Sequence, residues 1–498
     1  MMLTEADGAV TSYIDSVGKR HRKSHGIYYT DRAICEYLID HFVEITGQTR
    51  VVEPGCGCGY FALELFRKFK EMLPSISPES ILKRNLVLID NDTNALKVLS
   101  RLLDVDISNF LNGSFLLDQR FQPASFDYVI GNPPYAAKLT DEEKRYCSRI
   151  FPEFSESTKR FESSANFIKL GIDLLRPGGT LVFVVPSTIL RIHSYEPLRQ
   201  YVKKECFVRG ILDIRRAFDD VGYETTIVIL DKKDSNAAAK PTFLKTKTGI
   251  YGFDLSTGTD HECNYRFFES MRIFPLFIGK RDLSIITQIE QNTVRLREIA
   301  SMPRGAHIDI SNENISDTQK AGYIPILFGR GIGKYKIYAP QKYIRWPFEG
   351  FWELRQKHLQ DKLLVQNLAY KIVAAYDSNG HFVNDTINTV FIKDKDFPPL
   401  YILGILNSNL INYYFQNTIT NRARLNIHLD HYYLGEIPIR RAAVNDKASL
   451  VEVVEQFLRQ PLSENRKEIE RAVYRIYGIK EEEIDYIETA AMKGKKNT

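Results

Sequence analysis

The stretch VVEPGCGCGYF, residues 51–61, places an apolar strand, a carboxylate and three alternating glycines directly ahead of a helical segment. Glycines let a backbone approach a bound ligand closely, and the first amides of the helix that follows are unpaired donors. The next apolar strand, LVLID at residues 86–90, ends in Asp90, at the position where a carboxylate accepts both hydroxyls of a ribose. The order of strand, glycine loop, helix, strand and acid therefore predicts a site for an adenosine-containing cofactor.

A plainer interpretation of this loop stays open. Gly55, Gly57 and Gly59 do not have the spacing of the dinucleotide fingerprint GxGxxG, so they would then form an ordinary tight turn while Asp90 caps the next helix. Cys56 and Cys58 stand in the same loop, but the six cysteines of the chain contain no CxxC pair. Small side chains in a crowded loop explain these two cysteines better than a metal pair, so we expect reduced thiols and no metal.

Outward from this loop, short β-branched runs alternate with helical segments between residue 27 and about residue 230. This alternation predicts an α/β fold in which a doubly wound, Rossmann-like sheet of parallel strands is joined by crossover helices. The expected strands cover residues 50–53, 85–89, 126–130, 180–185, 208–214 and 225–230. RPGGT, residues 176–180, is typical of a helix end and turn before a strand.

The polar, proline-containing stretch 231–242 predicts a linker after the sheet. Residues 243–440 lack regular helical periods and favour a mixed α+β domain, whereas residues 441–498 contain two apolar stripes at helical spacing and predict a helical tail. The first domain is then expected at residues 20–235.

Composition is that of an ordinary soluble protein: 498 residues, of which 44% are hydrophobic and 26% charged. No stretch approaches the roughly 20 apolar residues of a membrane span, and the N-terminal residues lack the plan of a signal peptide, which predicts a cytoplasmic protein. The net charge of +5 permits a nucleic-acid partner without requiring one.

After the apolar strand FDYVI comes the motif GNPPY, residues 131–135, at the carboxyl end of the expected sheet. It resembles the signature of S-adenosylmethionine-dependent methyltransferases that act on a planar amino group, of which the DNA adenine-N6 methyltransferases are the best-known users. Such an amine is a poor nucleophile because its lone pair is delocalised into the ring. The side-chain oxygen of Asn132 and the carbonyl of Pro133 would accept its two N–H groups and localise the lone pair, while the proline rings hold the acceptors still and Tyr135 offers a stacking face. An ordinary Asn-Pro-Pro turn is the alternative.

KSHGIYYTDRAICEYLI, residues 23–39, looks like the segment that opens the gamma-group (TaqI-type) DNA adenine-N6 methyltransferases of restriction-modification systems, and the order of motifs follows that group. The resemblance implies that Glu53 serves the methionine end of S-adenosylmethionine and Asp90 its ribose. The full set of cofactor-binding residues that it implies is Tyr28, Thr30, Glu53, Pro54, Gly55, Gly57, Gly59, Asp90, Asn91, Ser114, Asn132 and Phe167. The catalytic set is Asn132, Pro133, Pro134 and Tyr135, with Tyr135 and Phe218 stacking on the target base. For Phe167 and Phe218 a role as core aromatics stays open.

The chain departs from the group at one point. Members usually present an aspartate that binds the amino group of the cofactor's adenine, and this chain has Ser114 there. Asn112 or Asp118 would replace that aspartate, or the backbone would suffice.

Several stretches after residue 243 interleave basic, aromatic and amide side chains and look like the C-terminal specificity region of TaqI-type enzymes. The expected DNA-binding residues are Arg330, Lys334, Lys336, Arg345, Arg422 and Arg424. A solvated surface is the plainer explanation for each of these clusters. The partners expected from the resemblance are double-stranded DNA and a cognate restriction endonuclease that acts on the same site without an obligate complex.

The resemblance implies methylation of adenine N6 in a specific double-stranded DNA sequence, after the base has been flipped out of the helix. RNA adenine-N6 methylation shares every catalytic requirement and stays open. Protein glutamine methylation is weaker, because those enzymes lack a long domain after the catalytic sheet. Cytosine-C5 methylation is excluded because none of the six cysteines follows a proline. Neither a degenerate, non-catalytic subunit nor a fused endonuclease is favoured, since the catalytic motif is intact and fewer than 30 residues precede the first motif.

Overall fold

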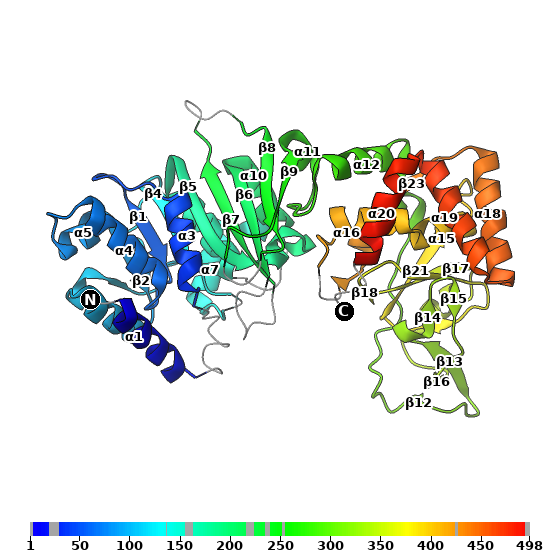
Figure 1. Cartoon of the computed structure of the whole chain (residues 1–498). Coiled ribbons are helices and arrows are strands. Elements are labelled where there is room, and N and C mark those ends of the chain that lie inside the picture. Colours follow the sequence, from blue (N-terminus) through cyan, green and yellow to red (C-terminus); the bar gives the residue numbers. More distant parts are fainter. Residues whose placement is uncertain are drawn as a thin grey trace. The chain divides into compact units, whose positions relative to one another are not determined.

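The computed structural model describes residues 3–18, 29–135, 137–154, 163–215, 224–234, 240–250, 254–423 and 427–493 (Figure 1). The chain divides into two compact units, Met1–Gly279 and Lys280–Thr498. The first unit holds the large sheet, and the division lies further along the chain than the linker expected at residues 231–242. The assignment of three functional segments to residues 20–235, 243–440 and 441–498 remains a prediction.

Within the described residues, the first unit is built on one mixed sheet of nine strands in the order β3-β2-β1-β4-β5-β7-β6-β8-β9. The strands β1 to β5 pair in parallel, β7 runs antiparallel to both β5 and β6, and β9 runs antiparallel to β8. The strands are β1 (Val51–Pro54), β2 (Leu86–Asp90), β3 (Leu111–Asn112), β4 (Phe126–Gly131), β5 (Leu175–Pro186), β6 (Cys206–Arg215), β7 (Thr225–Lys232), β8 (Phe243–Thr248) and β9 (Thr259–Asn264).

Helices flank this sheet, as the crossover pattern predicted (Figure 1). They are α1 (Leu3–Ser16), α3 (Arg32–Phe42), α4 (Tyr60–Met72), α5 (Pro78–Arg84), α6 (Thr93–Leu103), α7 (Asp141–Ile150), α9 (Ser163–Leu174), α10 (Glu196–Glu205) and α11 (Tyr265–Ser270). In α4, Leu65 and Phe69 fall on one face and are fully buried in a core shared with α3 and the first strands. Helix α9 packs closely on the sheet at Gly171, where a Cβ would lie 2.9 Å from Leu181 Cδ1.

The second unit combines small sheets with helices (Figure 1). Its strands are β10 (Thr293–Arg295), β11 (Ala300–Ser301), β12 (Ile315–Ser316), β13 (Tyr323–Leu327), β14 (Ile332–Gly333), β15 (Lys336–Ile337), β16 (Lys342–Arg345), β17 (Lys362–Gln366), β18 (Leu368–Ala369), β19 (Ala374–Asp377), β20 (Phe382–Val383), β21 (Ile387–Ile392), β22 (Ile427–His428) and β23 (Pro438–Arg440). Its helices are α12 (Lys280–Glu290), α13 (Leu296–Ile299), α14 (Trp352–His358), α15 (Pro399–Asn407), α16 (Asn409–Thr418), α17 (His431–Leu434), α18 (Val444–Arg459), α19 (Ser463–Tyr477) and α20 (Glu481–Lys493).

The terminal helices of this unit pack on α15 and α16. Gly478 ends α19 as its C-cap, in the left-handed conformation with φ +65°.

The α/β fold, the Rossmann-like sheet and the six expected strands are confirmed, and the structure adds β3, β8 and β9 to the sheet. The expectation that all strands are parallel is wrong for β7, because apolar runs buried on both faces do not report strand direction. The expected helix end before RPGGT is present, since α9 ends at Leu174, and Gly178 has a left-handed φ of +79°. The segment lies within β5, which begins at Leu175, at the point where the register of β5 against β4 shifts. None of the helices in the described ranges is long and apolar enough to cross a bilayer.

Candidate active site

The glycine loop between β1 and α4 adopts a conformation that requires its glycines. Gly55 and Gly57 have φ values of +73° and +53°, in the region that side chains disfavour. A Cβ on Gly57 would also lie only 3.1 Å from Cε1 of Tyr29. The loop therefore combines a left-handed backbone with a close approach, and the residue that approaches it is Tyr29, which precedes the N-cap of α3 by two positions.

Asp90, at the end of β2, binds the glycine loop directly. Its Oδ2 accepts a hydrogen bond of 2.7 Å from Gly57 N, and its Oδ1 accepts one of 2.7 Å from Asp92 N. Burial raises the pKa of Asp90 to about 6, although these backbone donors oppose the shift. The alternative that Asp90 caps the next helix is wrong, because the N-cap of α6 is Asp92, which accepts from Asn94 N and Ala95 N.

Glu53, on β1, is the second acid at this edge of the sheet. Its side chain is 2% exposed, and burial, together with the nearby charge of Asp90, raises its pKa well above the usual range. Among the described residues Glu53 Oε2 has no hydrogen-bond partner, and the same holds for the buried Oγ1 of Thr30. Buried acceptors without a donor are rare in folded proteins, so a ligand that carries N–H or O–H groups fits here.

The motif GNPPY lies against both the acid and the glycine loop. At Gly131, the last residue of β4, a Cβ would lie 3.3 Å from Glu53 Cγ, and a Cβ on Gly55 would lie 3.6 Å from Pro134 Cδ. The expected catalytic residues and two of the expected cofactor residues are thus brought together from β1 and β4, which pair in parallel. Pro133 is buried, and Tyr135 is only 2% exposed. A base could therefore stack on the Tyr135 ring only after the neighbouring residues that bury this ring have moved.

The side chain of Ser114 makes a contact that the sequence did not indicate. Ser114 Oγ donates a hydrogen bond of 2.5 Å to Glu143 Oε1. The other carboxylate oxygen of Glu143 accepts from Thr140 N at 2.8 Å, which completes a capping box at the start of α7. The pattern Thr-x-x-Glu predicts such a box, but no local signal indicates the contact with Ser114, 29 residues away.

The two residues considered as substitutes for the missing aspartate have other contacts. Asp118 pairs with Arg120, which lowers the pKa of Asp118, and Asn112 Nδ2 donates to the Asp90 carbonyl oxygen at 3.3 Å. Phe167, on α9, is buried and lies 5.2 Å, ring centre to ring centre, from Phe115. The carboxylate nearest to Ser114 is therefore that of Glu143.

Of the remaining residues expected to bind the cofactor or the base, some lie within the described residues and others do not. Pro54 is buried at the end of β1, Gly59 is the residue before α4, and Asn91 is exposed after β2. Tyr28 and Phe218 lie outside the described residues.

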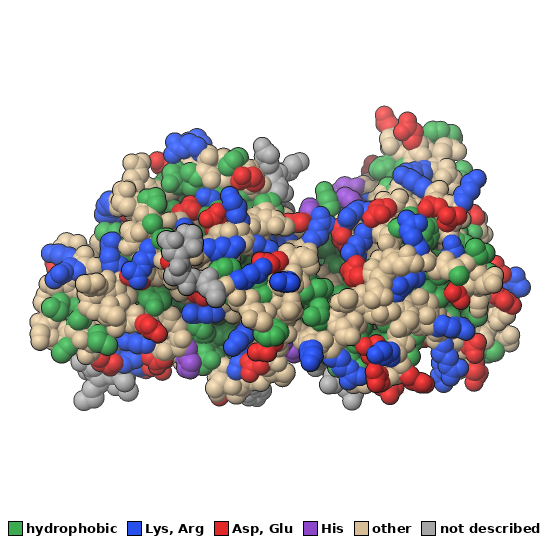
Figure 2. All heavy atoms as spheres, turned by 90° about the horizontal axis from the view of Figure 1, so that it is seen from above, with side chains coloured by type: hydrophobic (Ala, Val, Ile, Leu, Met, Phe, Trp, Pro, Cys, Tyr) green, Lys and Arg blue, Asp and Glu red, His purple; other side chains and the backbone are tan. Residues whose placement is uncertain are grey.

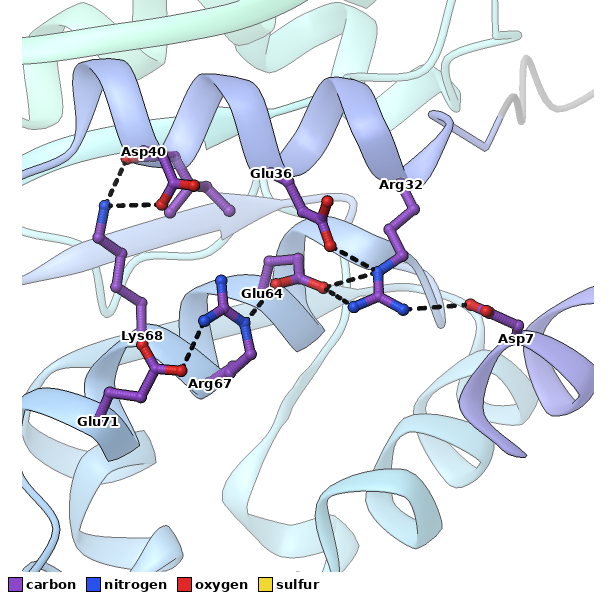
Figure 3. Close-up of polar contacts among 9 residues, drawn as sticks. Asp7, Arg32, Glu36, Asp40, Glu64, Arg67, Lys68 and Glu71 are labelled. Carbon is purple, nitrogen blue, oxygen red and sulfur yellow. Dashed lines mark hydrogen bonds and ion pairs between the residues drawn. The ribbon is translucent and has the colours of Figure 1, made fainter. Parts of the chain in front are cut away.

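Ion pairs hold the starts of the helices that flank the glycine loop (Figure 3). Arg32, in the first turn of α3, donates from Nε to Glu36 at 2.9 Å and to Glu64 of α4 at 3.0 Å. Arg67 donates to the other oxygen of Glu64 at 2.6 Å, and Arg32 also lies 3.8 Å from Asp7 of α1. Glu64 is 2% exposed, and its charge is matched by the partly exposed guanidinium groups of Arg32 and Arg67.

Helix α1 contributes to the same region. Val10 packs with Cys58 of the glycine loop and with Ala95 of α6. Tyr13 donates a hydrogen bond of 2.5 Å from its hydroxyl to Asp92 Oδ2. Cys56 and Cys58 are buried thiols, and burial raises the pKa of Cys58 to about 12, so this thiol is not a ready nucleophile.

Of the expected DNA-binding residues, Arg330, Lys336 and Arg345 are exposed. Lys334 donates to the carbonyl of Asn407 at 2.6 Å, and Arg422 donates to Asn417 Oδ1 at 3.0 Å, so both also serve the fold of the second unit. Arg424 lies outside the described residues. Figure 2 shows basic and acidic side chains interspersed over the face in view, which agrees with the small net charge of +5.

Two family models match the chain. Residues 60–218 match the Eco57I restriction-modification methylase, and residues 324–439 match the TaqI-like C-terminal specificity domain. The type II methyltransferase M.TthHB8I of Thermus thermophilus is 24% identical over 391 residues, which cover 73% of this chain and 80% of the relative. The modification methylase CviBIII of Paramecium bursaria Chlorella virus NC1A is 27% identical over 195 residues, or 39% of this chain and 46% of the relative.

Solved structures share the fold. The type IIL restriction-modification enzyme MmeI in complex with DNA has a TM-score of 0.63 at 11% identity, over 95% of this chain and 80% of that one. A nuclease-deletion mutant of the type ISP enzyme LlaGI has a TM-score of 0.58 at 12% identity, over 91% of this chain and 48% of that one.

Proposed function

We propose that the chain methylates the N6 amino group of adenine in a specific double-stranded DNA sequence, because residues 60–218 match a restriction-modification methylase and residues 324–439 match a TaqI-like C-terminal specificity domain. S-adenosylmethionine is the cofactor of this methyltransferase family. The observation that carries the proposal is the position of residues 131–135, which lie against Glu53 and the glycine loop at the carboxyl ends of β1 and β4.

The residues of this edge fit the cofactor. The buried Glu53 Oε2, which lacks a partner among the described residues, would accept from the ammonium group of the methionine end. Asp90, already held by two backbone amides, would accept from the ribose hydroxyls beside the left-handed backbone of Gly55 and Gly57. The bound cofactor supplies a methyl group on a positively charged sulfur.

The chain's own chemistry is then the alignment of the target amine. Asn132 Oδ1 and the Pro133 carbonyl would accept the two N–H groups of the adenine and localise the nitrogen lone pair for direct in-line attack. No strong general base is required, since the sulfonium is already a good leaving group and orientation alone lowers the barrier by several kcal/mol. The amine proton passes to solvent after the transfer.

A base within a duplex cannot reach such a pocket, so we infer that the target adenine is flipped out, at a cost of a few kcal/mol. Contacts elsewhere on the DNA must repay that cost. In the second unit Arg330, Lys336 and Arg345 are exposed, and we infer that they meet phosphates or base edges. The match of residues 324–439 to a specificity domain supports DNA over RNA or a protein glutamine as the substrate.

We further infer that the chain is the protective enzyme of a restriction-modification system, in the cytoplasm, with a cognate endonuclease that acts on the same site without an obligate complex. The decisive experiment offers labelled S-adenosylmethionine with duplex DNA, RNA and protein in parallel, followed by identification of the modified nucleoside or amino acid. N6-methyladenosine from RNA alone, or methylated glutamine, would refute the proposal.

A further inference from the structure

Ser163 makes a contact that connects α9 with the catalytic motif. Its hydroxyl donates a hydrogen bond of 2.5 Å to the carbonyl oxygen of Pro134 and accepts one of 3.2 Å from Ala137 N. The side chain is fully buried. The hydroxyl therefore acts both as donor and as acceptor, and both partners are backbone groups that follow the acceptor pair Asn132 and Pro133.

The two backbone groups that Ser163 joins are the first carbonyl and the fourth amide of a four-residue segment. In a simple β-turn these two groups would bond to each other. Here the hydroxyl of Ser163 donates to the carbonyl and accepts from the amide, so both groups are fastened to α9.

The position of this bridge matters for the acceptor pair, Asn132 and Pro133. On the upstream side the pair follows Gly131, which is paired with Phe183 in the sheet. On the downstream side Pro134 comes next, and its carbonyl is the group that Ser163 holds. The proline rings restrict φ between these two anchors, so the bridge removes the remaining freedom at the downstream end.

Helix α9 also carries Phe167, four residues and about one helical turn after Ser163. The resemblance assigns Phe167 to the cofactor's adenine. One rigid helix would thus place both the downstream end of the amine acceptors and a wall of the cofactor site.

We propose that Ser163 is a positioning residue for methyl transfer: its hydroxyl fixes the Pro134 carbonyl and the Ala137 amide to α9 and thereby orients Asn132 and Pro133 toward the target amine. The inference rests on the proposed function and extends it to a residue that touches neither substrate nor cofactor. Misplacement of reacting groups by about 1 Å lowers turnover by about a hundredfold, which sets the scale of the expected effect.

The neighbouring residue provides a matched control. Ser164 is also fully buried, but its Oγ has no hydrogen-bond partner among the described residues. Ser164→Ala therefore removes the same atom from the same helical turn without breaking a described hydrogen bond, whereas Ser163→Ala breaks two.

The experiment compares the full-length protein with its Ser163→Ala, Ser163→Thr and Ser164→Ala variants. Calorimetry gives the Kd for S-adenosylmethionine, steady-state kinetics on duplex DNA gives kcat and KM, and thermal unfolding confirms that each variant is folded. We expect kcat of Ser163→Ala to fall about 10- to 100-fold, with KM and the cofactor Kd within about threefold of wild type. Ser163→Thr, which keeps the hydroxyl, should recover most of kcat, and Ser164→Ala should match wild type.

Wild-type kcat in Ser163→Ala would overturn the inference, and so would equal losses in Ser163→Ala and Ser164→Ala, which would indicate packing alone. Should Ser163→Thr be unfolded because its extra methyl group does not fit, Ser163→Cys takes its place, with a kcat expected between those of wild type and Ser163→Ala because a thiol is a weak donor. Absence of methyl transfer to DNA by the wild-type protein would instead refute the proposed function.

Discussion

Replacement of Glu53 by glutamine tests the cofactor site through two opposite effects. In the protein without cofactor, Glu53 is 2% exposed and its Oε2 lacks a partner among the described residues. An unsatisfied buried polar group costs about 1–3 kcal/mol, and more when it is charged. Glutamine keeps the shape but cannot ionise, so we expect Glu53→Gln to raise the free energy of unfolding by about 1–2 kcal/mol at pH 8.

The pH dependence of this gain has a definite sign. Burial raises the pKa of Glu53 well above 4.5, so the wild-type side chain loses stability as the pH rises from its unfolded pKa through its folded pKa. The glutamine variant has no such loss at this position. The difference between the two proteins, measured by urea denaturation, should therefore be small at pH 5 and larger at pH 8.

The effect on cofactor binding is the reverse. A hydrogen bond to a charged group contributes about 1.5–3 kcal/mol, so its loss should weaken binding of S-adenosylmethionine about 10- to 150-fold. Calorimetric titration gives the Kd, and Glu44→Gln is the control, because the side chain of Glu44 is exposed. A Kd within about twofold of wild type, or a variant less stable than wild type at pH 8, would contradict the role given to Glu53.

Three further predictions concern other titratable or catalytic groups. Burial raises the pKa of Asp90 to about 6, so the Kd for S-adenosylmethionine should rise as the pH falls below this value. In calorimetry from pH 5 to pH 8, Asp90→Asn should bind the cofactor weakly, with a Kd that hardly changes with pH. A wild-type Kd that does not change with pH would count against the ribose contact. Asn132→Ala should lower turnover on DNA by about 10²- to 10³-fold while the cofactor Kd stays within about twofold, as checked by transfer assays and calorimetry. Burial raises the pKa of Glu470 on α19 from 4.5 to about 7, so the free energy of unfolding should fall as the pH rises through this interval. Glu470→Gln should remove this contribution to the pH dependence of stability. Equal pH dependences of the two proteins in urea denaturation would refute the prediction.

Much of the first unit was predictable because its signals are local. The six expected strands are short apolar runs bounded by polar or turn residues, and such runs need only their own sequence to be recognised. The glycine loop and the acid at the end of β2 were predictable for the same reason, since a left-handed backbone leaves few choices other than glycine.

What escaped prediction depends on contacts between distant residues. FLKTKT, the sequence of β8, is mostly polar, yet Thr246 and Thr248 are buried on the sheet because β6 and β9 pair with this strand. The hydrogen bonds of Ser114 with Glu143 and of Ser163 with Pro134 each join residues 29 positions apart, and a single serine gives no periodic signal. In the same way, the choice of Asp92 over Asp90 as helix cap depends on which carboxylate is already held by Gly57.

The pairing of β6 with β8 has a consequence for any separation of the two halves of the chain. A fragment that stops near residue 235 would lack β8 and so leave one edge of β6 unpaired. Unpaired strand edges promote aggregation between molecules. The boundary after Gly279 keeps that edge covered. Hybrid proteins that exchange the second unit for that of a relative, to test whether this unit sets the recognition sequence, should therefore be joined after β9 and not at the polar stretch that follows β7.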